Sequence, residues 1–170
     1  RTDSRTVTVP TTYEVTHPRD PKQSVRVTTS RLQLMRYELQ HRGARRALTV
    51  LDYDGWPDFA AVPPQTLALL CEAVDAARGT GPLAVHCAGG TGRTGTFILA
   101  HALSQAPDLT PKTAPPVALS LLMGLRLQRA GAVETSAQWR AALESAGLPL
   151  PQGSTLTRAL ERFGGCFTSA

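Results

Sequence analysis

The fold is decided by residues 82–99, Pro-Leu-Ala-Val-His-Cys-Ala-Gly-Gly-Thr-Gly-Arg-Thr-Gly-Thr-Phe-Ile-Leu. The apolar run Leu83–Val85 follows a Gly-Pro break and predicts a buried strand. Glycines fill half of residues 88–93, and an apolar helical pattern begins at Phe97. A strand, a glycine-rich turn and a helix start together form an anion site. Successive amide groups there point into one concavity at the positive end of the helix dipole.

Cys87 and Arg93 place a nucleophile and a phosphate ligand in this concavity. A thiolate at a helix N-terminus can have its pKa lowered to roughly 3.5–7.5. The planar guanidinium of Arg93 matches two oxygens of a phosphate, and the glycines let the backbone approach the anion. Thr94 can place its hydroxyl near the sulfur and stabilise it as a leaving group. The alternative is a buried cysteine in an ordinary glycine-rich turn, which the intact His-Cys-x5-Arg-Thr-Gly pattern disfavours.

The residues from His86 to Gly95 resemble the signature loop of the protein tyrosine phosphatases. This resemblance implies that Cys87 attacks phosphorus and that Thr94 assists breakdown of the phosphocysteine. No metal ion and no organic cofactor is implied. The residues implied to hold the phosphoryl oxygens, with His86 in support, are Ala88, Gly89, Gly90, Thr91, Gly92 and Arg93.

Cleavage of a phosphoester by a cysteine needs a proton donor for the leaving oxygen, which is worth typically 10²–10⁴-fold in rate. The chain offers three candidates close together: Asp52, Asp54 and Asp58. Trp56-Pro57-Asp58 resembles the mobile acid loop of the tyrosine-specific branch of the family. The resemblance implies that Asp58 is the general acid and that Trp56 anchors the hinge. Phe59-Ala60-Ala61 stands where the family usually has a small glycine turn, which leaves the mobility of this loop open.

Residues 126–139 resemble the family's Arg-x-Gln-Arg helix end and the glutamine loop that follows it. In the family, a first Gln orients the water that hydrolyses the phosphocysteine, and a second Gln four residues later reaches the active site. The second is present as Gln138, but Glu134 stands at the first position. Thr135 or Ser136 is a suitable N-cap for the next helix. The alternative is that Glu134 and Gln138 are solvent-facing polar residues at a helix start.

The remaining segments predict strands and helices around this site. The expected strands are Thr6–Val9, Tyr13–Thr16, Val25–Thr28, 31–39 and Ala47–Tyr53, an antiparallel meander that feeds a mixed sheet. The expected helices run from Pro64 to Arg78, from Arg93 to about Gln105, from Pro115 to Arg129, from the Thr135 region to near Gly147, and within 148–170. We expect an α/β fold, a protein tyrosine phosphatase-like domain with a twisted mixed β-sheet flanked by helices. It is a single catalytic domain over residues 1–170, with the resemblance spanning about 24–147 and a C-terminal extension from 148.

Composition sets broader limits. Hydrophobic residues make up 42% and charged residues 18%, as in ordinary globular domains, and no apolar run approaches the ~20 residues that cross a membrane. The net charge of +5 suits an anionic substrate, but the basic residues are dispersed, which predicts a solvated surface and no nucleic-acid partner. Those residues are Arg31, Arg36, Arg42, Arg45, Arg46, Arg126 and Arg129. Cys71 lies in an apolar helical pattern and is expected in the core. A thiolate enzyme needs a reducing compartment, so we expect a cytoplasmic location, or that of a secreted effector acting in a host cytosol.

These motifs predict a phosphatase that hydrolyses phosphotyrosine in proteins through a phosphocysteine on Cys87, with Asp58 as general acid and then base. The expected partner is a phosphorylated protein, and the oligomeric state is left open. One alternative is an inositol phosphate or phosphoinositide phosphatase, which would use the same Cys and Arg. The lack of a Lys-Asn-Arg-Tyr-like segment favours it and Trp56-Pro57-Asp58 opposes it. Another alternative is a pseudophosphatase module that binds phosphorylated partners, which Glu134 favours and the intact Cys87, Arg93 and Asp58 oppose.

Overall fold

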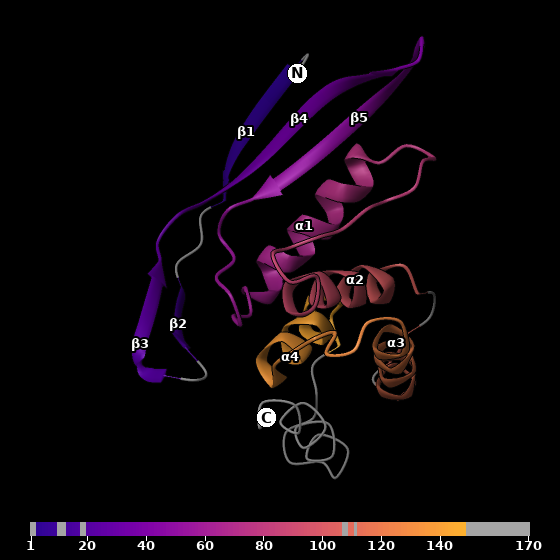
Figure 1. Cartoon of the computed structure of the whole chain (residues 1–170). Coiled ribbons are helices and arrows are strands. Elements are labelled where there is room, and N and C mark those ends of the chain that lie inside the picture. Colours follow the sequence, from indigo (N-terminus) through magenta and orange to yellow (C-terminus); the bar gives the residue numbers. More distant parts are fainter. Residues whose placement is uncertain (1–2, 10–12, 18–19, 107–108, 111, 149–170) are drawn as a thin grey trace.

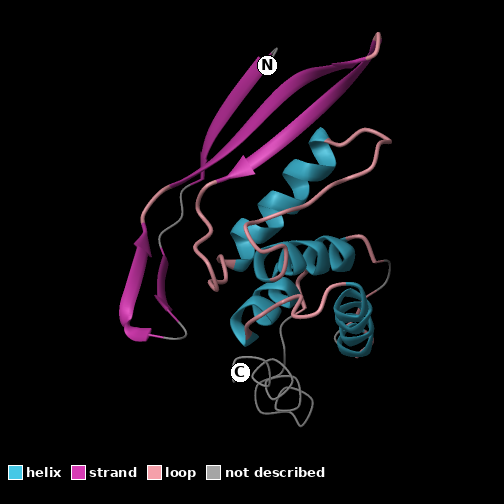
Figure 2. Cartoon of the chain, in the orientation of Figure 1, coloured by secondary structure: helices cyan, strands magenta, loops and turns pink. Residues whose placement is uncertain are grey.

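The computed structural model describes residues 3–9, 13–17, 20–106, 109–110 and 112–148. Strands fill the first third of this part and helices fill the rest (Figures 1 and 2). The strands are β1 (Asp3–Val9), β2 (Tyr13–His17), β3 (Asp20–Val27), β4 (Ser30–His41) and β5 (Ala44–Tyr53). The helices are α1 (Pro64–Ala77), α2 (Gly92–Ser104), α3 (Ala114–Gln128) and α4 (Ser136–Ser145). The C-terminal helix predicted within 148–170 falls on residues that lie, from 149 onward, outside the described part.

The strands form two antiparallel groups. One sheet has the order β1-β4-β5, and β2 pairs separately with β3. The long β4–β5 hairpin closes at Arg42 and Gly43, both in the left-handed region with φ of 48° and 80°. Two consecutive positive φ values form the turn type that matches the twist of paired strands. The predicted strands are thus confirmed, but the predicted meander is wrong: β1 pairs with β4 and not with β2, because β2 and β3 form a separate hairpin between them in the sequence.

The helices pack against one another on one side of the strands (Figure 1). Proline stands in the first turn of α1 and of α3, where the missing N–H costs no hydrogen bond. The largest fully buried side chains include Leu67 of α1, Leu99 of α2 and Leu143 of α4. The base of the β4–β5 hairpin joins this core through side chains on one face of the sheet: Leu32, Leu51 and Tyr53. The four predicted helices between Pro64 and Gly147, and the α/β class, are confirmed.

The strand predicted over Leu83–Val85 is wrong. The segment before Cys87 has no strand pairing, and the Leu83 side chain is 40% exposed. A strand needs a neighbour for its N–H and C=O groups, and no strand of the described part pairs with this segment. The parallel neighbour that would make the sheet mixed is therefore not formed, and the described pairings are antiparallel. The segment still delivers Cys87 to the N-terminal end of α2.

Candidate active site

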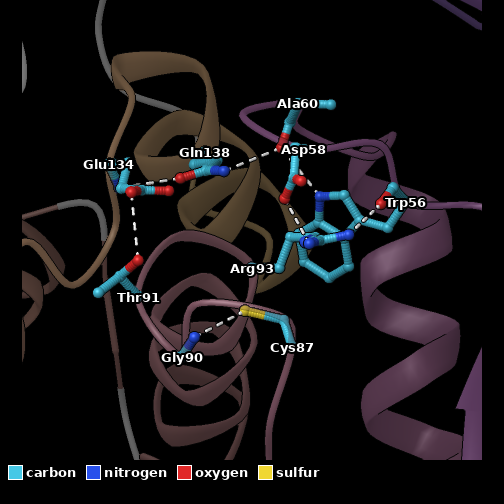
Figure 3. Close-up of polar contacts among 9 residues, drawn as sticks. All are labelled: Trp56, Asp58, Ala60, Cys87, Gly90, Thr91, Arg93, Glu134 and Gln138. Carbon is cyan, nitrogen blue, oxygen red and sulfur yellow. Dashed lines mark hydrogen bonds and ion pairs between the residues drawn. The ribbon is translucent and has the colours of Figure 1, made fainter. Parts of the chain in front are cut away.

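Cys87 lies in a cradle of amide groups at the start of α2. The Gly90 N–H donates to Cys87 Sγ at 3.2 Å (Figure 3). Gly90 has a φ of +69°, a conformation that turns its amide toward the sulfur and that residues with a Cβ rarely adopt. Burial raises the pKa of the Cys87 thiol, but the nearby Thr94 hydroxyl and the loop amides lower it by more. Together they lower the pKa from 9.0 to about 7. The thiolate is therefore abundant at neutral pH, as a nucleophile requires.

The buried Thr94 hydroxyl has no hydrogen-bond partner elsewhere in the described part of the chain. It makes no hydrogen bond of ordinary geometry there, yet it lies close enough to the sulfur to lower the thiol pKa. An unsatisfied buried hydroxyl is costly, so its position next to a thiolate is consistent with the role implied for Thr94.

Arg93 joins the signature loop to the acid loop. Its Nη1 donates to the Trp56 carbonyl at 2.9 Å, and its Nη2 forms an ion pair with Asp58 Oδ1. The Arg93 side chain is only 22% exposed, whereas that of Asp58 is 65% exposed. Figure 3 shows Asp58 and Trp56 reaching down onto the guanidinium, with Cys87 below it. A carboxylate thus occupies a donor group that could instead hold a phosphoryl oxygen.

The other two acid candidates have different surroundings. Asp54 accepts from the backbone N–H of Arg31 at 2.7 Å and from its guanidinium at 2.9 Å. The backbone hydrogen bond, with the guanidinium in support, lowers the pKa of Asp54 and keeps it ionised. Asp52 is exposed on β5 opposite Gln33 of β4. Within the described part of the chain, Asp58 is the carboxylate that pairs with Arg93.

The acid loop is held by its own backbone and by α4. The Ala60 carbonyl accepts from the Trp56 indole at 2.9 Å and from Gln138 Nε2 at 3.0 Å. Phe59, the departure from the family's glycine turn, has a φ of 59°. A non-glycine residue in this region costs roughly 1–2 kcal/mol, which the surrounding contacts must offset.

Gln138 is fully buried and uses both ends of its amide. Its Oε1 accepts from the N–H groups of Glu134 at 2.9 Å and Thr135 at 3.3 Å, while its Nε2 holds Ala60. Its own N–H donates to Thr135 Oγ1 at 3.1 Å, which completes a capping box and makes Thr135 the N-cap of α4. The solvent-facing interpretation of Gln138 is wrong, because its side chain ties α4 to the acid loop.

Glu134 lies against the signature loop. Its Oε1 accepts from Thr91 Oγ1 at 3.1 Å, and a Cβ on Gly92 would lie 2.1 Å from its Oε2. The carboxylate therefore covers the first residue of α2, where the helix dipole favours an anion. The solvent-facing interpretation also fails for Glu134 (Figure 3). The residues that the sequence motifs single out, from the signature loop, the acid loop and the glutamine loop, meet at one place.

A family model described as protein-tyrosine phosphatase matches residues 3–146. The chain belongs to the protein tyrosine phosphatase family. Tyrosine-protein phosphatase 3 of Schizosaccharomyces pombe is 36% identical over 85 residues, which cover 46% of this chain and 28% of that protein. Tyrosine-protein phosphatase non-receptor type 7 of Rattus norvegicus is 32% identical over 106 residues, covering 60% of this chain and 29% of that protein.

Solved structures of phosphatases share the fold. A structure of PTPN18 superposes with a TM-score of 0.55 at 26% identity, covering 69% of this chain and 42% of that one. The Trypanosoma cruzi protein tyrosine phosphatase TcPTP1 gives 0.53 at 26% identity, covering 78% and 47%. This chain thus spans less than a third of the two curated relatives and less than half of these two solved chains. The expected family and its α/β fold are confirmed.

Arg126 and Arg129 both contact the backbone of this phosphatase-family site, but only Arg126 departs from the solvated surface that we expected, because Arg129 stays exposed. Arg126 donates to the carbonyls of Ala132 at 3.0 Å and Val133 at 2.9 Å, and burial lowers its pKa. Val133 is a β-branched residue with a φ of 60°, and Arg126 fixes it in that conformation just before Glu134. Arg129 donates to the Gly89 carbonyl at 2.9 Å and so braces the signature loop from outside. The spacing Arg-x-Gln-Arg was the signal in the sequence for this pair.

Cys71 takes the structural role expected of it, and His101 has a structural role as well. Cys71 is buried, and burial raises its pKa to about 12, so it is not a second nucleophile. His101 stacks on Phe97 and contacts Asp75 of α1 at 2.8 Å. Within the described residues, no set of three or more His, Cys, Asp or Glu side chains is placed to hold a metal ion. In the same residues, no helix has the length and apolar character needed to span a bilayer.

Proposed function

We propose that this chain hydrolyses phosphotyrosine in proteins through a phosphocysteine on Cys87. The observation that carries the proposal is the ion pair between Asp58 and Arg93, which brings an acid from the acid loop to the cradle that holds the thiol. The thiol pKa of about 7 supports the nucleophile, and the names of the relatives, tyrosine-protein phosphatases, support the substrate class.

The proposed reaction has two displacements at phosphorus. Cys87 Sγ attacks in line, the bond to the phenolic oxygen breaks, and Asp58 gives its proton to that oxygen. Arg93 and the loop amides stabilise the charge on the equatorial oxygens. Water then attacks the phosphocysteine, Asp58 takes a proton from it, and phosphate and the thiolate are released with help from Thr94. Because Asp58 and Trp56 occupy the Arg93 guanidinium in this structure, substrate binding must exchange at least one of these contacts for phosphoryl oxygens.

A pseudophosphatase that only binds phosphorylated partners is the second candidate. Glu134 favours it, because its carboxylate against Gly92 disfavours a neighbouring dianion. The ordered contacts of Cys87, Arg93 and Asp58 favour turnover. We further propose that the protein works in a reducing compartment such as a cytosol, because the thiolate must stay reduced, and that residues 1–170 act as one catalytic domain.

Hydrolysis of three substrates measured side by side tests the proposal: a phosphotyrosine peptide, a phosphoserine peptide and an inositol polyphosphate. We expect the phosphotyrosine peptide to be preferred and the Cys87→Ser variant to be inactive on all three. Preference for the inositol polyphosphate would reject the substrate class but keep the mechanism. No turnover of any substrate, together with binding of the phosphotyrosine peptide, would establish the pseudophosphatase instead.

A further inference from the structure

The outer face of the β4–β5 hairpin carries apolar side chains that do not belong to the hydrophobic core of the described part of the chain. Residues directly opposite in an antiparallel pair share a face, and so do alternate residues of one strand. The pairs Tyr37↔Leu48 and Met35↔Val50 therefore lie on one face, together with Leu39. Leu39 is 51% exposed and Leu48 is 42% exposed, whereas Met35, Tyr37 and Val50 are half-buried. We call this set the outer patch: Met35, Tyr37, Leu39, Leu48 and Val50.

The outer patch faces away from the helices. The side chains of the hairpin that join the core, Leu32, Leu51 and Tyr53, belong to the opposite face. Farther along that opposite face, where the hairpin projects past α1 (Figure 1), Glu38 and Arg45 form an exposed ion pair at 3.2 Å. The projecting end of the hairpin thus carries an ion pair on its core-facing side and apolar side chains on its outer side. Contiguous exposed apolar patches of this kind mark interaction surfaces.

The charges that flank the outer patch indicate what covers it. On β5, Arg46 precedes the apolar pair Leu48 and Val50, and Asp52 follows it, all on the same face. Both charged residues are exposed, and neither makes an ion pair within the described part of the chain. One positive and one negative charge are therefore placed symmetrically about an apolar centre. This arrangement is complementary to itself after a two-fold rotation.

We propose that two copies of this chain pair face to face through the outer patch. The two-fold axis lies in the plane between the two sheets, at right angles to β5, and passes over the point midway between Leu48 and Val50. Leu48 of one copy then lies over Val50 of the other, and Tyr37 lies over Met35, which suits the attraction between sulfur and an aromatic ring. Arg46 of each copy meets Asp52 of the other, so the contact contains two identical ion pairs. Sheets packed in this way lie about 10 Å apart.

The size of the face predicts a weak dimer. Ten residues at about 3.4 Å each, on strands about 4.8 Å apart, give a surface roughly 34 Å long and 10 Å wide. Each copy then buries less than the roughly 800 Å² a side of a standard interface. We expect a dissociation constant in the range of about 1–100 µM and, because of the ion pairs, weaker association at high salt.

Sedimentation velocity over a concentration series tests the proposal on the full chain. We expect a monomer–dimer equilibrium that Leu48→Gln weakens by at least about tenfold. Leu127→Gln is the matched control, because Leu127 is 87% exposed on α3, far along the chain from the outer patch. A chain that stays monomeric to several times the upper end of the expected range, or equal effects of the two variants, would overturn the proposal.

Charge exchange tests the register and uses only exposed positions. Asp52→Arg and Arg46→Asp should each weaken self-association, because like charges then face each other. An equimolar mixture of the two variants should form a heterodimer, because both flanking pairs are again opposite in sign. The double variant should likewise recover the original dissociation constant within about threefold. A mixture and a double variant that both remain dissociated would overturn the two-fold arrangement.

Discussion

Gln138 offers the sharpest test of how the site is built, because one buried amide serves two loops. Replacing it with alanine leaves the N–H groups of Glu134 and Thr135 without their acceptor and releases the Ala60 carbonyl from α4. Each stranded and partly buried donor costs about 1–3 kcal/mol. We expect Gln138→Ala to lower the free energy of unfolding by about 2–6 kcal/mol for the two donors together. At about 2–4 °C per kcal/mol for a chain of this size, Tm falls by roughly 4–24 °C.

The matched control is Thr135→Ala, which removes the N-cap oxygen but leaves the contact between Gln138 and Ala60. We expect it to cost about 1 kcal/mol in stability and to leave kcat nearly unchanged. Gln138→Ala should in addition lower kcat by about tenfold or more for a substrate with a poor leaving group, because the acid loop loses its tie to α4. Both variants are measured by thermal unfolding and by hydrolysis of two aryl phosphates that differ in leaving-group pKa. Equal kcat values for Gln138→Ala and Thr135→Ala on both substrates would refute the role of this contact in placing the acid.

Three further predictions concern the reacting groups. The rate of Cys87 alkylation by iodoacetamide should rise with pH through about 7, where the thiolate forms. Thr94→Ala should move the midpoint of this pH profile toward 9.0, because the sulfur loses the nearby hydroxyl. An unmoved midpoint would show that Thr94 does not stabilise the thiolate. Asp58→Asn should lower kcat by about 10²–10⁴ for poor leaving groups and much less for an activated aryl phosphate, whereas Asp54→Asn should not show this dependence. Rapid mixing with an aryl phosphate should give a burst near one equivalent followed by slow turnover. Glu134→Gln should speed the slow phase alone; if it leaves that phase unchanged, Glu134 does not hinder the hydrolytic water.

The helices and the signature loop could be predicted because their signals are local. Proline at the start of α1, an apolar stripe and a glycine-rich turn depend on neighbouring residues. The strand over Leu83–Val85 could not be judged in this way, because an apolar run becomes a strand only if another strand lies beside it. The apolar residues predicted a strand, but no neighbouring strand pairs with this segment in the described part of the chain.

In the site, too, the features with local sequence signals could be predicted, and those that depend on distant contacts could not. The residue motifs identified Cys87, Arg93 and Asp58, and the structure brings Asp58 onto Arg93. The surroundings of Glu134 could not be predicted, because its contact with Thr91 joins residues 43 positions apart. The solvent-facing alternative for Gln138 also failed for a tertiary reason, since the Ala60 carbonyl that it holds comes from 78 positions away.

In the proposed mechanism, Cys87 carries the phosphoryl group between substrate and water. The most direct measurement is an acid quench of the enzyme during turnover of a phosphotyrosine peptide, followed by intact mass and peptide mapping. We predict a fraction of the chain heavier by one phosphoryl group located on Cys87, and none in Cys87→Ser. A phosphoryl group on another residue, or rapid turnover by Cys87→Ser, would contradict it.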